Sequence, residues 1–464
     1  MEKQTKIVSS VVGAVVVVAA VLAGINHHQN TYFNKNTSIN GVNVGGLTSQ
    51  QAYEKVKKTK LSNDVYFNGQ KIYDGTETSS GITAKDKSKF TAALKKQKTF
   101  FPSSKTSNLT VKGSATDTSQ QTAMKAAATT AINAYNADKT IAVDAQAVLK
   151  NGKISVTKAK SGNGLDVEKM LQEFNDQKYS KSVKLTKIVK TPVKADSQTV
   201  AKEKRKLEAL QNKTVDFKVN NTTVKLSAKN LITSATYANG QYNIDTTAIK
   251  KKIAQINSKY ATLGKSFKFK THSGSTITTS NSGTYGWKID PDAAASAIVS
   301  AFSSNKSTTL DAKDFIYGIG YNENGTGYGV TANDGIGDTY VEVSISAQHA
   351  WWYKDGKLVF DADVVTGTED GSNATPKGVY YIMYKQQNTT LRGQNDNGSS
   401  YASPVSYWAP FTQSGCGFHD ASWRTDWSST AYLTGGSHGC VNMHTYDAGT
   451  AYADMEQNEP VVIY

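Results

Sequence analysis

An internal repeat in the region before residue 320 constrains the fold of this chain more than any other feature. Residues 65–72 and 217–224 each place an Asn-containing turn between two runs of β-forming residues, which predicts two β-hairpins. Residues 154–165 and 277–287 each lead from a strand-like run through a glycine-containing stretch to the start of a helical pattern. Because the same order of elements occurs twice, the sequence indicates a duplicated unit.

The helices of both repeats have clear start signals. Asp166 and Asp290 can each cap a helix by accepting hydrogen bonds from its first free N–H groups. Pro291 stands at the first helical position of the second repeat, where its missing N–H costs nothing. Helical patterns also extend over residues 118–136 and 196–211. Each repeat is therefore expected to form an α+β module.

Length and cysteine content limit how such a chain can be stabilised. Its 464 residues exceed what one hydrophobic core usually organises, so several domains are expected. The two cysteines, Cys416 and Cys440, are far fewer than a disulfide-stapled secreted scaffold needs. The fold must therefore be held together by packing.

An apolar segment near the N-terminus, residues 7–25, is long enough to cross a membrane, which takes roughly 20 apolar residues. Lys3 and Lys6 precede it, and lysines on that side favour a cytoplasmic N-terminus with the rest of the chain exported. We therefore expect an anchor in the lipid bilayer and an extracellular body. The alternative is a signal peptide cleaved near the small residues at 21–23, which would give a secreted protein.

The formal net charge of +15 is carried mainly by lysines scattered through the first 270 residues. Such lysines form a solvated surface in most proteins. Inside a cell this balance would favour nucleic acid as a partner, but the export segment argues against it. Anionic polymers of a cell wall are the better candidates, bound weakly and in a salt-dependent way.

The sequence changes character after residues 321–337, which are rich in Gly, Asn and Thr and are expected to be a linker. Residues 340–345 alternate cleanly between apolar and polar, which predicts a strand. An Asp-Gly turn within residues 354–356 joins the runs 351–353 and 357–360, which predicts a hairpin. The C-terminal region is therefore expected to be mainly β.

The expected organisation is multidomain. In chain order, the expected parts are residues 1–30 (cytoplasmic N-terminus and transmembrane helix), 31–195 (first α+β module), 196–320 (second α+β module), 321–337 (linker) and 338–464 (mainly β domain). Both cysteines lie in the last of these parts.

The C-terminal part carries a candidate nucleophile with its base. Residues 437–442 are Ser-His-Gly-Cys-Val-Asn, so Cys440 stands between a glycine and an apolar residue, and His419 lies a short way upstream. A thiol with its normal pKa of about 8.5 is mostly protonated at neutral pH, and a nearby imidazolium can lower that pKa enough to hold a reactive thiolate. The pair predicts acyl transfer through a thioester.

Five landmarks occur in order in the C-terminal region. They are residues 348–353 (Gln-His-Ala-Trp-Trp-Tyr), 363–367 (Asp-Val-Val-Thr-Gly), 375–380 (Thr-Pro-Lys-Gly-Val-Tyr), 417–419 (Gly-Phe-His) and 437–443 (Ser-His-Gly-Cys-Val-Asn-Met). Together they resemble the L,D-transpeptidase catalytic domain of the YkuD type. The entry segment at residues 39–56, and the two modules in tandem, resemble the type 4 peptidoglycan-binding modules that precede such domains in Gram-positive envelope enzymes; a plain structural stalk is the alternative.

The resemblance implies roles for individual residues and needs no cofactor. Cys440 matches the nucleophile that attacks the carbonyl of the third residue of a peptidoglycan stem tetrapeptide and expels the terminal D-alanine. His419 matches the base that takes the thiol proton and later serves the leaving and attacking amines. Ser437 and His438 match positions that line the thiol and orient the imidazole. Gly439 permits close backbone approach, and N–H groups around it and Cys440 would serve the oxyanion.

Three other positions leave alternatives open. Many members of the family carry arginine where this chain has Asn442, which exchanges a fixed charge for an amide and leaves carboxylate recognition at this position open. Cys416 is expected to be a small buried residue; a disulfide with Cys440 is the alternative, and it would consume the nucleophile. A metal site around His438 lacks the spacing of known zinc motifs, so none is expected.

Aromatic residues surround His419 in a long polar insertion, namely Tyr401, Tyr407, Trp408, Trp423 and Trp427. They are expected to be packing residues, with a wall over a peptide substrate as the alternative. Three functions therefore compete. The first is a membrane-anchored L,D-transpeptidase that forms 3→3 cross-links from a donor tetrapeptide and an acceptor amine. The second is an L,D-carboxypeptidase that uses water instead, and the third is a wall-binding surface protein without activity.

Overall fold

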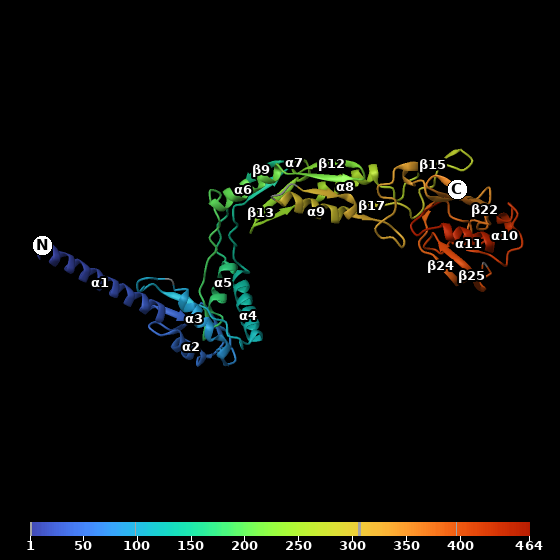
Figure 1. Ribbon diagram of the computed structural model, residues 1–464. Coiled ribbons are helices and arrows are strands. Elements are labelled where there is room, and N and C mark those ends of the chain that lie inside the picture. The colour runs from blue at the N-terminus through green and yellow to red at the C-terminus, as the bar shows by residue number, and fades with distance from the viewer. Residues whose placement is uncertain (1, 98, 305–307, 396) are drawn as a thin grey trace. The chain divides into compact units, whose positions relative to one another are not determined.

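The computed structural model describes residues 2–97, 99–304, 308–395 and 397–464, with the backbone alone for residues 2–16. Figure 1 follows the chain from blue at its N-terminus to red at its C-terminus. The chain is divided into two compact units. The first comprises Met1–Gln146 and Thr157–Val200, and the second comprises Ala147–Val156 and Ala201–Tyr464.

The N-terminal helix α1 covers Glu2–Thr31. Much of the span expected at residues 7–25 lies outside the described side chains, which begin at residue 17. Among the described residues, no helix combines the length and the apolar character that a membrane crossing needs. The structure therefore gives the transmembrane helix no support, and the anchor remains a prediction from the sequence.

The first unit is α+β. After α1 its elements are β1 (Thr37–Ile39), β2 (Val42–Asn43), α2 (Ser49–Lys57), β3 (Lys60–Leu61), β4 (Asp64–Phe67), β5 (Gln70–Tyr73), β6 (Thr78–Ser79), η1 (Ala84–Asp86), α3 (Lys87–Lys95), β7 (Ser107–Leu109), α4 (Thr118–Asn136), α5 (Val167–Gln177) and β10 (Ser182–Leu185). The predicted hairpin is β4–β5, with its turn at Asn68 and Gly69 in the left-handed region. Asp166 caps α5, and β10 then pairs in parallel with β4.

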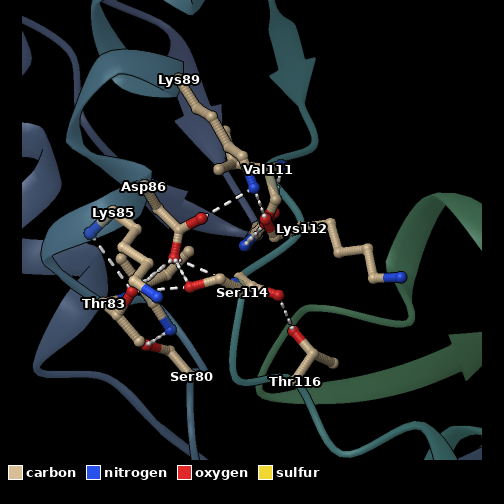
Figure 2. A network of polar contacts seen from close by, with 12 residues as sticks. Ser80, Thr83, Lys85, Asp86, Lys89, Val111, Lys112, Ser114 and Thr116 are labelled. Carbon is tan, nitrogen blue, oxygen red and sulfur yellow. Dashed lines mark hydrogen bonds and ion pairs between the residues drawn. The ribbon is translucent and has the colours of Figure 1, made fainter.

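A buried carboxylate, Asp86, joins two loops of this unit (Figure 2). One oxygen accepts from the backbone N–H and the hydroxyl of both Thr83 and Ser114, at 2.9 to 3.2 Å. The other pairs with Lys89 Nζ at 2.7 Å, and that ammonium also donates to the Lys112 carbonyl. Burial alone would raise the pKa of Asp86, but these bonds outweigh it and hold the pKa well below its ordinary value.

Replacing Asp86 with asparagine is expected to destabilise this unit by about 2 kcal/mol at neutral pH, because the charged acceptor of four hydrogen bonds and of Lys89 becomes a neutral amide. Since the folded pKa is lowered, the stabilisation is complete above the unfolded pKa of about 3.9 and is lost as the pH falls toward the folded value. The stability lost in Asp86→Asn is measured by backbone hydrogen exchange of residues 80–115 in the full chain. Asp74→Asn is the control because Asp74 pairs with Lys71 in solvent; equal exchange in both variants would contradict the prediction.

The second unit begins with another α+β region. Its elements are β8 (Ala147–Lys150), β9 (Lys153–Val156), α6 (Gln198–Gln211, which starts in the first unit), β11 (Thr214–Val219), β12 (Thr222–Ser227), α7 (Ala228–Leu231), β13 (Ser234–Ala238), β14 (Gln241–Ile244), α8 (Thr247–Tyr260), β15 (Lys268–Lys270), β16 (Thr276–Thr278), β17 (Lys288–Ile289), α9 (Pro291–Ser303), β18 (Thr309–Asp311), η2 (Ala312–Asp314), β19 (Ile316–Tyr317) and η3 (Ala332–Gly335). The hairpin β11–β12 turns at Asn220, and Asp290 caps α9. β18 then pairs in parallel with β11. This is the arrangement of β4, β5, α5 and β10, which supports the duplication.

The units of the structure divide the chain differently from the sequence-based ranges. The hairpin β8–β9 lies within the range expected for the first module, yet β8 pairs with β13 of the second unit. The segment expected to be a linker is packed. Tyr328 accepts from the Asn220 N–H and donates to Asp311, and Ile336 is buried.

The C-terminal region is mainly β, as expected. Its elements are β20 (Tyr340–Ser344), β21 (His349–Lys354), β22 (Lys357–Asp363), β23 (Gly378–Tyr381), β24 (Gln386–Gln394), β25 (Ser400–Pro410), β26 (Gly417–Asp420), α10 (Tyr432–Gly435), β27 (Val441–Met443), α11 (Thr445–Asp454) and β28 (Pro460–Ile463). A five-stranded sheet has the order β22-β21-β20-β28-β23, and a four-stranded sheet has the order β24-β25-β26-β27. Trp352, Phe411 and Phe418 lie in a core formed by both sheets and α11.

Candidate active site

Two neighbouring strands of the four-stranded sheet bring the predicted residues together. β26 and β27 run in parallel, and their register places His419 opposite Asn442. Cys440 directly precedes β27. Gly439 before it has φ +110°, a conformation that favours glycine, and a Cβ there would lie 2.7 Å from Cys416 Sγ. Gly439 thus lets the chain turn tightly just before Cys440.

A cavity of about 180 Å³ opens beside this turn. Its lining residues are Leu391, Asn395, Tyr401, Ser403, His419, Trp423, Arg424, Gly436, Ser437, His438, Cys440 and Asn442. All of the predicted site residues except Gly439 belong to this lining. No sequence motif pointed to the remaining lining residues in loops and in β24 and β25, namely Leu391, Asn395, Ser403, Arg424 and Gly436.

Hydrogen bonds fix the tautomer of His419, which is buried. Nδ1 lies 2.9 Å from the Asp420 carbonyl oxygen, which only accepts, so Nδ1 carries the proton. Nε2 therefore carries a lone pair and accepts from Asn442 Nδ2 at 2.9 Å. Burial lowers the pKa of His419, and the positive charge of Arg424 lowers it further, against the contribution of Asp420. The imidazole is held as a neutral base.

Arg424 determines which way the Asn442 amide faces. Its Nε and Nη2 donate to Asn442 Oδ1 at 3.1 and 3.0 Å, while its Nη1 donates to the Gly435 carbonyl at 2.7 Å. With the amide oxygen held by the guanidinium, the amide nitrogen faces His419. Asn442 carries no charge where many family members have an arginine. Arg424 places a positive charge directly beside this position.

The thiol of Cys440 contacts the backbone of Gly415 and Gly417. It donates to the Gly415 carbonyl at 3.6 Å and receives a hydrogen bond from the Gly417 N–H. Burial raises the pKa of Cys440 to about 12, and the neighbouring Cys416 thiol adds to the rise, which the Gly417 N–H only partly offsets. The sequence predicts a resting thiolate beside an imidazolium, whereas the raised thiol pKa and the lowered imidazole pKa both favour the uncharged forms, a neutral pair, in the free protein.

Alkylation of Cys440 by iodoacetamide, an uncharged reagent, is expected to be slow at neutral pH in the free protein. Because the thiol pKa is raised to about 12, the thiolate fraction should grow about tenfold with each pH unit through the alkaline range. Peptide mass mapping at several pH values separates Cys440 from the buried Cys416. A rate that levels off near pH 7 would show a thiolate already formed and contradict the neutral pair.

Ser437 stabilises the turn in front of Cys440 through its hydroxyl group. Ser437 Oγ donates to the Cys440 carbonyl at 2.6 Å and accepts from the Gly439 N–H at 3.1 Å. The Gly439 N–H, expected to serve an oxyanion, is therefore already engaged. His438 stacks on Tyr401 with ring centroids 5.5 Å apart. Within the described residues, neither side chain hydrogen-bonds to His419.

Of the other residues singled out in the sequence, some belong to the core and others line the site. Cys416 is buried and free, as expected for a small core residue. Trp408 is buried, whereas Trp423 is half exposed, stacks on His419 at 5.8 Å and lines the cavity. Trp427 stacks on His444. In the described part of the chain, no cluster of His, Cys, Asp or Glu side chains is arranged to hold a metal ion.

Comparison with known families matches residues 338–463 to the L,D-transpeptidase catalytic domain, YkuD. The C-terminal region is a YkuD-type L,D-transpeptidase catalytic domain. Residues 197–311, within the range expected for the second module, match a putative peptidoglycan binding domain of type 4, so a domain of this family precedes the catalytic domain. A comparison with curated proteins found no match.

Solved structures similar to this chain are L,D-transpeptidases. The avibactam carbamoyl enzyme of Ldtfm is 29% identical over 56% of this chain and 96% of its own, with a TM-score of 0.45. A cysteine-to-serine mutant of Enterococcus faecium L,D-transpeptidase is 28% identical over 56% and 98%, with a TM-score of 0.44. The catalytic domain of the E. faecium enzyme is 39% identical over 27% of this chain and 97% of its own, with a TM-score of 0.26.

Proposed function

We propose that this protein is a peptidoglycan L,D-transpeptidase that works through a cysteinyl thioester and forms 3→3 cross-links. The observation that carries the proposal is that Cys440 and His419 line one cavity of an L,D-transpeptidase catalytic domain. A nucleophilic thiol and an imidazole with one unprotonated nitrogen, both on side chains that line the same cavity, are the two groups that acyl transfer requires.

The first half-reaction acylates the enzyme. The thiol proton of Cys440 moves to His419 Nε2, and the thiolate attacks the carbonyl carbon of the third stem residue. The tetrahedral intermediate collapses, the C–N bond to the terminal D-alanine breaks, and His419 returns the proton to the leaving amine. A thioester and free D-alanine result. The Asp420 carbonyl stabilises the imidazolium formed between these steps by holding Nδ1–H.

The second half-reaction transfers the acyl group to an amine. A side-chain amine of another stem peptide attacks the thioester carbonyl, His419 takes a proton from it, and the Cys440 thiol is regenerated. Attack at the side chain of a third residue gives the 3→3 cross-link. Water in place of the amine gives the L,D-carboxypeptidase reaction from the same thioester, so the cavity's access to an amine decides between the two products.

The wall-facing setting is part of the proposal. The match at residues 197–311 supports attachment to peptidoglycan, and the net charge of +15 supports a weak attraction to anionic wall polymers. The membrane anchor at residues 1–30, or secretion after its cleavage, rests on the sequence alone. In either case the substrate would be met outside the membrane.

Incubating the full-length protein with defined disaccharide-tetrapeptides and weighing the products by mass spectrometry tests the function. A transpeptidase gives a dimer whose mass is that of two donors less one alanine. A tripeptide product alone would replace the proposal with the carboxypeptidase. Unchanged substrate with folded protein would favour a wall-binding protein without activity.

A further inference from the structure

The nitrogen that must accept the thiol proton is already occupied in the free protein. Nδ1–H of His419 is held by the Asp420 carbonyl, so only Nε2 can act as the base. The Asn442 amide N–H donates to that same nitrogen at 2.9 Å. If Nε2 became protonated, its N–H would face the N–H of the amide, and two donors cannot bond to each other. This amide orientation therefore opposes the imidazolium.

Arg424 maintains that orientation. Two of its N–H groups converge on the single oxygen of Asn442, which cannot face His419 while the guanidinium holds it. If the guanidinium moved away, the amide could turn over and present its oxygen to a protonated Nε2. The contact between Arg424 and Asn442 thus decides whether the Asn442 amide opposes or stabilises protonated His419.

Arg424 is also placed to meet a substrate. Its half-buried side chain lines the cavity together with Cys440. A guanidinium recognises a carboxylate through two parallel hydrogen bonds, which are stronger than bonds to a neutral amide oxygen. The donor tetrapeptide of the proposed reaction ends in a carboxylate, so it would compete directly with Asn442 for Arg424.

We propose that Arg424 is the receptor for the terminal carboxylate of the donor peptide, and that carboxylate binding releases Asn442 to stabilise protonated His419. This inference rests on the proposed function. In the step it controls, the Cys440 S–H bond breaks, the proton joins His419 Nε2, and the electron pair stays on sulfur as the thiolate. Arg424 acts on this transfer through Asn442 as a positioning residue, and it touches the substrate at the carboxylate.

The charges around the base agree with this assignment. Arg424 lowers the pKa of His419 and Asp420 raises it, while Cys416 raises the pKa of the Cys440 thiol. Asp426 is the acidic neighbour of Arg424. A carboxylate bound to Arg424 would neutralise the positive charge that opposes the imidazolium, and the proton would then move from sulfur to nitrogen more readily.

Alkylation of the free protein by iodoacetamide tests the resting contact without any substrate. Arg424→Ala is expected to alkylate at Cys440 about tenfold faster at neutral pH, which corresponds to a shift of about one pKa unit in the thiol–imidazole pair. Arg392→Ala, on the exposed surface of β24, is the matched control and should behave as wild type. An unchanged or slower alkylation profile in Arg424→Ala would overturn the inference.

A double comparison tests carboxylate recognition. Wild type and Arg424→Ala are each assayed with a tetrapeptide donor and with the same donor ending in D-alaninamide. Wild type should lose about 100-fold in kcat/KM with the amide, the effect of one charged hydrogen-bonded pair, and Arg424→Ala should lose as much with the acid and nothing more with the amide. Arg424→Lys should restore part of the preference for the acid. Independent, additive losses would refute direct recognition. If no donor reacts with wild type, the proposed function fails, while the alkylation result still decides the contact.

Discussion

Replacing Cys440 with alanine is expected to lower the rate of cross-linking by on the order of 10⁶, the scale seen when a covalent nucleophile is removed. Without the sulfur no thioester can form, and neither the dimer nor the trimmed tripeptide should appear. The measurement is product mass spectrometry with defined tetrapeptide donors. The loss should be complete for both products because both arise from one acyl-enzyme.

Cys416→Ala is the matched control for that result. Cys416 is the second thiol of the chain, is buried in the core and does not line the cavity. The variant should keep its activity and acylate at Cys440. Activity that survives in Cys440→Ala but disappears in Cys416→Ala would move the nucleophile to the other cysteine and overturn the site described above.

Replacing His419 with glutamine is expected to lower kcat/KM by about 10⁴ at neutral pH, the upper range for general acid–base catalysis. The pH dependence gives the sharper signature. Because the thiol pKa is raised to about 12, the variant's rate should rise about tenfold per pH unit in the alkaline range, as hydroxide replaces the missing base. The deficit relative to wild type should therefore shrink as the pH increases.

The control for this prediction is His438→Gln, because His438 lines the same cavity but stacks on Tyr401 and, among the described residues, has no hydrogen bond to His419. It should lose far less activity and show no steeper alkaline rise than wild type. A deficit in His419→Gln that is the same at every pH would mean that His419 only supports the fold of the site.

Local signals in the sequence predicted much of the fold. Asp166 and Asp290 cap α5 and α9, as expected. These features succeed because the hydrogen bonds that define them lie within one turn of chain. The Ser-His-Gly-Cys run and upstream His419 likewise pointed to one cavity, since the resemblance extended over five ordered landmarks.

The same local signals do not predict contacts between residues that lie far apart in the sequence. Nothing in the segment around Arg424 shows that its guanidinium meets Asn442, because that contact depends on how the loop after β26 packs against β27. The pairing of β8 with β13 and the loops joined by Asp86 are of the same kind. The electrostatic state of the thiol was missed for a related reason: burial, which the motif does not report, raises its pKa.

The intact mass of the full-length protein after exposure to a stem tetrapeptide whose side-chain amine is acetylated, so that the donor cannot also serve as acceptor, tests the central claim most directly. We predict an increase equal to the donor less one alanine, located by peptide mapping on the segment that contains Cys440, and a comparable adduct with a carbapenem. An unmodified mass from folded protein whose Cys440 still reacts with iodoacetamide would contradict the thioester mechanism.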